Sequence, residues 1–224
     1  MTEKKSIFIV GTGTDIGKTY IAGLIVKKFL RSGINTAYFK AAMSGNIRDK
    51  NNALIPGDAL SVKKVSGSRQ ALSEMCPYVY EAAYSPHLAS RLEGNPVDFD
   101  YVLKKFDELS EKYDRVIMEG SGGILCPIRL DEEKNIWLED FIKARNFECI
   151  LVADAGLGTI NAVGLTAYYM KSRGLNLRGI IFNHFQPGNI LHEDNLKVCE
   201  EITGIKIIAC VRDNDKEINF TEAM

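Results

Sequence analysis

The stretch Gly11-Thr12-Gly13-Thr14-Asp15-Ile16-Gly17-Lys18-Thr19 decides the fold, because it joins the apolar run Ser6–Val10 to Ile21–Leu30, a segment of helical apolar periodicity. This order predicts a strand, a glycine-rich turn and a helix. Backbone N–H groups and the helix dipole at such a turn favour a bound anion. Lys18 would reach the β- and γ-phosphates of a nucleotide, and the Thr19 hydroxyl would ligate Mg²⁺.

The loop is a variant of the pattern G-x-x-x-x-G-K-[ST], because Thr12 stands in place of the first glycine. A chance Gly-Lys-Thr turn is the alternative interpretation. The strand before the loop and the helix after it favour nucleotide binding, since a bare pattern lacks that context.

Length and composition indicate one domain spanning residues 1–224, with 46% hydrophobic and 25% charged residues. The formal net charge of −1 gives no electrostatic reason to expect a nucleic-acid partner. Five cysteines without a C-x-x-C pair favour free thiols in a reducing compartment. The sequence has neither a signal segment nor an apolar run long enough to cross a bilayer, so we expect a cytoplasmic protein without membrane contact.

Continuous apolar runs alternate with helical segments along the chain, which predicts an α/β fold with a three-layer, doubly wound, mainly parallel sheet of the P-loop NTPase type. The predicted strands are Ile7–Val10, Thr36–Phe39, Arg115–Met118, Cys149–Val152, Gly179–Phe182 and Ile205–Val211. Ala41–Asn95 is broken into short helical pieces, among them Asp58–Val65 and Pro86–Glu93. We expect this long crossover to build part of the binding site, because ligands lie at the carboxyl ends of such strands.

Several polar residues follow predicted strands and are candidates for chemistry. Glu119 ends a strand and precedes Gly120-Ser121-Gly122-Gly123, where glycines allow close backbone approach to phosphate. Lys40 ends another strand, four residues before Ser44. The alternative interpretation of Lys40 is an ordinary solvated cation. Asp58 begins a helical piece, where an N-terminal cap or first-turn role is the stronger local interpretation.

Three further motifs have both structural and functional interpretations. Ser85-Pro86-His87 is typical of a helix start with Ser85 as the cap. Asp154–Asn161 places glycines between a strand and a helix, which indicates an anion site or only a tight turn. Asn183 closes a strand, where its amide would suit a nucleobase edge.

Together these motifs resemble the dethiobiotin synthetase family over nearly the entire chain. The family carries G-T-D-T-x-V-G-K-T, K-P-V-x-S-G, S-D-A, S-P-H, V-x-E-G-A-G-G, L-G-x-I-N and a strand that ends in Asn. Their counterparts here are Gly11–Thr19, Lys40–Gly45, Gly57–Ala59, Ser85–His87, Ile117–Gly123, Leu157–Asn161 and Asn183.

The resemblance implies a reaction in which CO₂ carboxylates 7,8-diaminononanoate to a carbamate, which attacks the γ-phosphate of MgATP. The second amine of the resulting carbamic-phosphoric anhydride closes the ureido ring, which gives dethiobiotin, ADP and phosphate.

The resemblance also implies a role for each matched residue. Lys40 and Lys18 would be catalytic, Ser44 and Thr14 would bind substrate, and Thr19, Asp58 and Glu119 would hold Mg²⁺. Gly158, Thr159 and Asn161 would contact substrate bound to a second subunit, so a homodimer is implied. The nucleotide would contact Asp15, Ile16, Gly17, Lys18, Thr19, Tyr20, Asp58, Glu119, Gly120, Ser121, Gly122, Asn183, His184, Cys210, Val211 and Arg212.

Two alternatives remain open from the sequence. One is another ATP-dependent ligase of the superfamily, such as the amino-terminal domain of a cobyrinate amidating synthetase, which normally continues into a glutaminase domain. The other is a regulatory nucleotide-binding module without catalysis. Lys40, Ser44, Asp58 and Glu119 together disfavour the second, since a switch has no need of a carbamate lysine.

Overall fold

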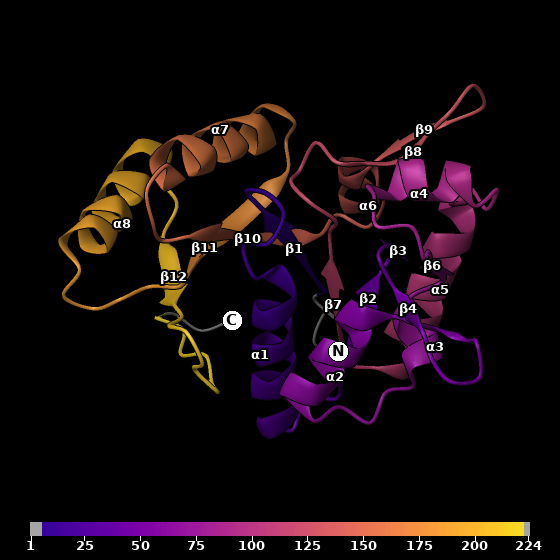
Figure 1. Ribbon diagram of the computed structural model, residues 1–224. Coiled ribbons are helices and arrows are strands. Elements are labelled where there is room, and N and C mark those ends of the chain that lie inside the picture. Colours follow the sequence, from indigo (N-terminus) through magenta and orange to yellow (C-terminus); the bar gives the residue numbers. More distant parts are fainter. Residues whose placement is uncertain (1–5, 222–224) are drawn as a thin grey trace.

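The computed structural model describes residues 6–221, and a parallel sheet of six strands lies at its centre (Figure 1). The strand order is β12-β11-β10-β1-β7-β2. The bounds are β1 Ile7–Gly11, β2 Thr36–Lys40, β7 Arg115–Glu119, β10 Glu148–Asp154, β11 Asn176–Asn183 and β12 Ile207–Cys210. All six predicted strands are therefore confirmed, although the last is shorter than the apolar run Ile205–Val211.

Residues of each strand alternate between two hydrophobic clusters, one on each face of the sheet. In β1, Ile7 and Ile9 belong to one cluster, and Phe8 and Val10 to the other. All four side chains are almost completely buried, because helices cover both faces. This two-sided burial explains why the strands are continuous apolar runs, and it confirms the doubly wound three-layer fold.

The helices separate between the two faces in the same way. One face is covered by α1 (Lys18–Arg31) and α2 (Gly57–Ser66), together with Ile218 of the C-terminal segment. The opposite cluster contains residues of α5 (Phe99–Lys112), α6 (Leu138–Ala144), α7 (Thr159–Ser172) and α8 (Ile190–Thr203). Within the described residues, no helix is both long and apolar enough to cross a membrane.

The long crossover after β2 consists of short elements, as expected. The predicted helices Asp58–Val65 and Pro86–Glu93 correspond to α2 and to α4 (Pro86–Leu92). Ser85 does precede α4, but its hydroxyl contacts Nδ1 of His87 instead of capping a helix N–H. The other elements are α3 Leu72–Met75, β3 Ala42–Met43, β4 Ile47–Arg48, β5 Leu54–Ile55 and β6 Tyr78–Val79. A separate hairpin, β8 Pro127–Leu130 and β9 Asn135–Trp137, lies before α6.

The free edge of β2 is closed by one buried side chain from this crossover. Gln70 accepts a hydrogen bond from Tyr38 N at 2.8 Å and donates one to Tyr38 O at 2.9 Å. A primary amide thus replaces the peptide group of a missing neighbouring strand. Because unpaired edge groups invite pairing with other chains, Gln70 both stabilises and protects this edge.

We expect Gln70→Ala to lower the free energy of unfolding by about 1–3 kcal/mol, because two buried backbone groups lose their partners. Denaturant unfolding followed by circular dichroism measures this loss. The exposed Gln186 provides the matched control, and Gln186→Ala should change stability by less than about 0.5 kcal/mol. Equal stability of the two variants would contradict this role for Gln70.

Candidate active site

The phosphate loop connects Gly11, the last residue of β1, to Lys18, the first residue of α1. It passes through two left-handed residues, Asp15 with φ 58° and Gly17 with φ 89°. A Cβ atom on Gly17 would lie only 2.1 Å from Nδ2 of Asn183. Position 17 therefore requires glycine for both its backbone angle and the close approach of β11.

Lys18 lies folded over this loop. Its Nζ donates a hydrogen bond to Gly13 O at 2.6 Å, and the residue is only 6% exposed. Burial lowers the pKa of Lys18 from its ordinary value, although the nearby Glu119 carboxylate opposes this shift. The ammonium group therefore lies against the phosphate loop, where the sequence predicts that a nucleotide phosphate binds.

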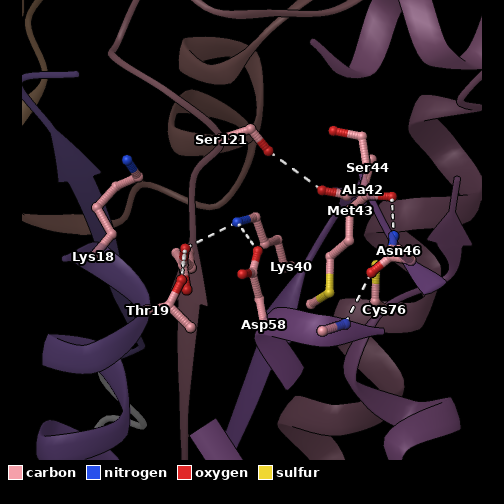
Figure 2. Close-up of polar contacts among 12 residues, drawn as sticks. Lys18, Thr19, Lys40, Ala42, Met43, Ser44, Asn46, Asp58, Cys76 and Ser121 are labelled. Atoms are coloured by element: carbon pink, nitrogen blue, oxygen red, sulfur yellow. Dashed lines mark hydrogen bonds and ion pairs between the residues drawn. The ribbon is translucent and has the colours of Figure 1, made fainter. Parts of the chain in front are cut away.

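Lys40, at the end of β2, joins two carboxylates from different elements (Figure 2). Its Nζ lies 2.6 Å from Oδ2 of Asp58 and 2.9 Å from Oε1 of Glu119. Burial alone would lower the pKa of Lys40, but Glu119 and Asp58 outweigh it and raise the pKa. Lys40 is therefore a fixed cation at neutral pH. Asp58 lies in the first turn of α2, and its carboxylate contacts Lys40, so its placement is explained by more than helix capping.

Glu119 is the most buried acid of this group, with 1% exposure at the end of β7. Its Oε1 also accepts from the Thr19 hydroxyl at 2.9 Å, and its Oε2 accepts from the Tyr38 hydroxyl at 2.7 Å. Burial and the Glu119 charge raise the pKa of Tyr38 far above its ordinary value, so Tyr38 stays a neutral donor. Every donor needed to stabilise a buried carboxylate is thus present.

The chemistry of these groups fits the predicted magnesium site. Thr19, Asp58 and Glu119 offer hydroxyl and carboxylate oxygens, which are the hard ligands that Mg²⁺ prefers. The Thr19 and Glu119 oxygens are within hydrogen-bond distance, and both carboxylates reach the same ammonium. Among residues 6–221, no three His, Cys, Asp or Glu side chains come together as a metal site.

A cavity of about 890 Å³ opens between the phosphate loop and the crossover. Twelve of its lining residues were predicted as site residues from the sequence: Thr14, Asp15, Gly17, Lys18, Thr19, Tyr20, Lys40, Ser44, Asp58, Glu119, Ser121 and Gly122. The sequence analysis gave no site role to other lining residues, among them Met43, Tyr84 and Cys126. Tyr84 and Cys126 lie outside the quoted motifs, so no sequence signal pointed to them.

Two serines, Ser44 and Ser121, border this cavity (Figure 2). The Ser44 hydroxyl donates to Tyr84 O at 2.5 Å, and the Ser121 hydroxyl donates to Ala42 O at 3.3 Å. The Ser44 bond joins two segments of the crossover, and the Ser121 bond joins the crossover to the glycine loop that follows β7.

Five residues predicted to contact the nucleotide lie at the ends of β11 and β12 and do not line the cavity: Asn183, His184, Cys210, Val211 and Arg212. Tyr20, predicted to do the same, lies on α1 and does line the cavity. Asn183 donates its amide to Ile16 O at 3.0 Å, so it supports the phosphate loop. Val211 is 1% exposed. Its backbone N–H donates to Phe182 O, and its carbonyl accepts from Phe185 N. Three of the other predicted nucleotide contacts bond to the segment that follows β12. His184 pairs with Asp213, Arg212 pairs with Asp215, and the Tyr20 hydroxyl donates to Asp215 O. Cys210 is half-buried.

The second predicted glycine loop lies at the start of α7 and does not line the cavity. Gly158 is its left-handed residue, and the buried Thr159 hydroxyl has no hydrogen-bond partner among the described residues. Asn195 fixes the turn by donating to Ala155 O at 2.8 Å and Gly156 O at 3.0 Å. Gly158, Thr159 and Asn161 therefore lie outside the cavity that contains Lys40.

Solved structures with a similar fold include a cell division complex and an ATPase. The MinC:MinD cell division complex of Aquifex aeolicus matches 95% of this chain and 83% of the solved chain, with a TM-score of 0.57 and 14% identity. A ParA family ATPase from Chlorobium tepidum matches 94% and 86%, with a TM-score of 0.55 and 14% identity. At these identities the likeness concerns the fold alone, and it agrees with the three-layer α/β fold built on a mainly parallel sheet.

Sequence comparison gives a narrower family. A family model described as "AAA domain" matches residues 5–219. The ATP-dependent dethiobiotin synthetase BioD of Brachyspira hyodysenteriae is 47% identical over 209 residues, which are 93% of this chain and 92% of the relative. The protein of the same name from Clostridium perfringens is 46% identical, over 93% and 90% of the two chains. The chain therefore belongs to the family of ATP-dependent dethiobiotin synthetases.

Proposed function

We propose that this protein is an ATP-dependent ligase of biotin biosynthesis, which carboxylates 7,8-diaminononanoate with CO₂ and closes the ring to dethiobiotin, with ADP and phosphate as the other products. Family membership supports the reaction. The observation that carries it is the buried Lys40 ammonium between Asp58 and Glu119, in the same cavity as Lys18 and Ser44. A nucleotide switch would gain nothing from that second buried cation.

In this proposal, Ser44 and Thr14 bind the diamine, and Lys40 stabilises the carbamate formed on it. Lys40 and Lys18 then neutralise the negative charge that develops as the carbamate oxygen attacks the γ-phosphate. Such charge stabilisation in a site with fixed groups is the main source of rate enhancement in phosphoryl transfer. Mg²⁺, held by Thr19, Asp58 and Glu119, would add further charge neutralisation at the phosphates.

We propose that the nucleotide lies along the phosphate loop. Asp15, Ile16, Gly17, Lys18 and Thr19 would contact its phosphates, together with Gly120, Ser121 and Gly122. Asp58 and Glu119 would contact it through the metal. Tyr20, Asn183, His184, Cys210, Val211 and Arg212 would form the base side. The left-handed turns and the placement of α1 directly after the loop support the phosphate part of this arrangement.

We also propose a homodimer, in which Gly158, Thr159 and Asn161 of one subunit complete the substrate site of the other. The unpartnered Thr159 hydroxyl at the start of α7 suits a carboxylate. Leu165 and Tyr168, three residues apart on α7, are 62% and 74% exposed. An apolar helix surface of this kind is typical of an interface between subunits.

We propose that residues 1–224 form a single domain and that the protein acts in the cytoplasm. All five cysteines are free, which suits a reducing compartment. Its small-molecule partners are the diamine, CO₂ and ATP.

The decisive experiment measures phosphate release with MgATP and bicarbonate, with and without 7,8-diaminononanoate, and identifies the product by mass spectrometry. Release that requires the diamine and yields dethiobiotin supports the proposal. Slow ATP hydrolysis that ignores the diamine would favour the regulatory module, and release that needs another amine would favour a different ligase.

Lys40→Ala should lower diamine-dependent turnover by roughly 10³-fold, because a charge-stabilising group of the transition state is removed. ATP affinity should change far less, since Lys18 and the loop remain. The matched control is Lys64→Ala, which removes an exposed lysine from α2 and should keep full turnover. Full activity in the Lys40 variant would remove this residue from the mechanism.

Tyr168→Glu should shift the dimer towards monomer in sedimentation velocity, because a charge would be buried in the proposed interface. Diamine-dependent turnover should fall in parallel at low protein concentration. Leu92→Glu, which alters a similarly exposed apolar residue on α4, is the control and should leave the dimer intact. A Tyr168 variant that remains dimeric would exclude this face of α7.

A further inference from the structure

Asn46 lies three residues after β3, which ends at Met43. It is a buried polar residue that joins two walls of the cavity, the Met43–Ser44 segment and the start of α2 at Gly57–Asp58. It is 6% exposed, and it does not line the cavity itself. Its amide nitrogen donates to Met43 O at 3.0 Å and to Tyr80 O at 2.8 Å. Its amide oxygen accepts from Gly57 N at 2.8 Å (Figure 2).

The acceptor bond replaces a missing helix cap. The residue before α2 is Pro56, which provides no side-chain acceptor for the first N–H groups of the helix. Gly57 is the first helical residue, and its N–H has no acceptor within the helix, because the first four N–H groups of any helix lack one. Asn46 provides that acceptor from a different loop, so it fixes the position at which α2 begins.

The next residue of the helix is Asp58, whose carboxylate reaches Lys40 at 2.6 Å. A shift at the start of α2 would therefore move a predicted magnesium ligand away from Lys40. The two hydrogen bonds that the Asn46 amide donates hold the other wall, at Met43 O and Tyr80 O. Met43 immediately precedes the predicted substrate residue Ser44. Backbone bonds from Tyr80 N to Met43 O and from Asn46 N to Tyr80 O complete this connection.

We propose that Asn46 is a positioning residue that couples the magnesium ligand Asp58 to the substrate residue Ser44. The inference rests on the proposed function, because it takes the roles of those two residues from it. The assignment of the amide is unambiguous, since two of its contacts are carbonyl oxygens and the third is an N–H. The amide nitrogen of Asn46 therefore holds the segment that contains Ser44, and its amide oxygen holds the start of α2.

The test compares ATP binding by isothermal titration calorimetry, with Mg²⁺ and with EDTA, in wild type and Asn46→Ala. We expect ATP affinity in EDTA to stay within twofold of wild type, because the phosphate loop is intact. The gain in affinity on adding Mg²⁺ should fall by about 10- to 100-fold, the usual effect of losing a residue that orients a metal ligand. The KM for the diamine should rise by about tenfold in the turnover assay.

Asp98→Ala is the matched control, because it also removes a side-chain acceptor at a helix N-terminus. Asp98 caps α5 through Tyr101 N at 2.8 Å, and neither residue lines the cavity. This variant should lose thermal stability as Asn46→Ala does but keep the Mg²⁺ dependence and the KM of wild type. If Asn46→Ala loses only thermal stability, with both readouts unchanged, Asn46 is structural and the proposal is wrong.

A second variant removes the same hydrogen bond from the helix side, in case Asn46→Ala does not fold. Gly57→Pro eliminates the N–H, and proline is favoured at the first position of a helix. Its ring would force the Asn46 amide aside, so the loss of Mg²⁺ dependence should match that of Asn46→Ala. In the double variant the two losses should not add, because they concern one bond. Wild-type Mg²⁺ dependence in Gly57→Pro, or additive losses, would overturn the coupling.

These binding measurements need no diamine, so they separate the two proposals. If wild type binds MgATP but never forms dethiobiotin, the proposed function fails while the role of Asn46 at Asp58 is still tested. If wild type forms dethiobiotin and Asn46→Ala binds MgATP normally, only the coupling fails.

Discussion

The buried carboxylate of Glu119 is the interaction on which the site depends. It accepts from Thr19 on α1, Lys40 on β2 and Tyr38 on β2, and it is itself carried by β7. An isolated buried charge would be strongly unfavourable, so these donors are required for the sheet to hold Glu119 there. The same contacts place the phosphate loop, the predicted catalytic lysine and the predicted metal ligands around one point.

Much of this arrangement was predictable because it follows from strand ends. In a parallel sheet the carboxyl ends of the strands lie at one edge, so the sequence places Gly11, Lys40 and Glu119 at the same edge. The structure adds that β7 lies between β1 and β2, which brings the three residues close together. The register of β2 against β7 pairs Lys40 with Glu119 directly. Continuous apolarity in turn identified the strands, because helices bury both faces of the sheet.

The parts that escaped prediction depend on single polar side chains that span loops. Gln70 and Asn46 are both buried amides that satisfy backbone groups far away in sequence. No periodicity or motif marks such a residue, because its role is set by which backbone groups the folded crossover leaves unpaired. Asp58 shows the same limit, since its local sequence indicates a helix start, and only the tertiary contact with Lys40 explains where its carboxylate points.

The charge of the cavity explains why the site would need a metal ion. Its charged lining residues are two lysines, Lys18 and Lys40, and three acids, Asp15, Asp58 and Glu119, with a formal charge of −1. A triphosphate placed against these groups would be repelled in a partly dehydrated cavity, where charges are screened less than in water. The N–H groups at the start of α1 offset part of that repulsion. In the proposed function, a divalent cation held by the two carboxylates would offset the rest, which would leave the Lys40 ammonium to act on the substrate.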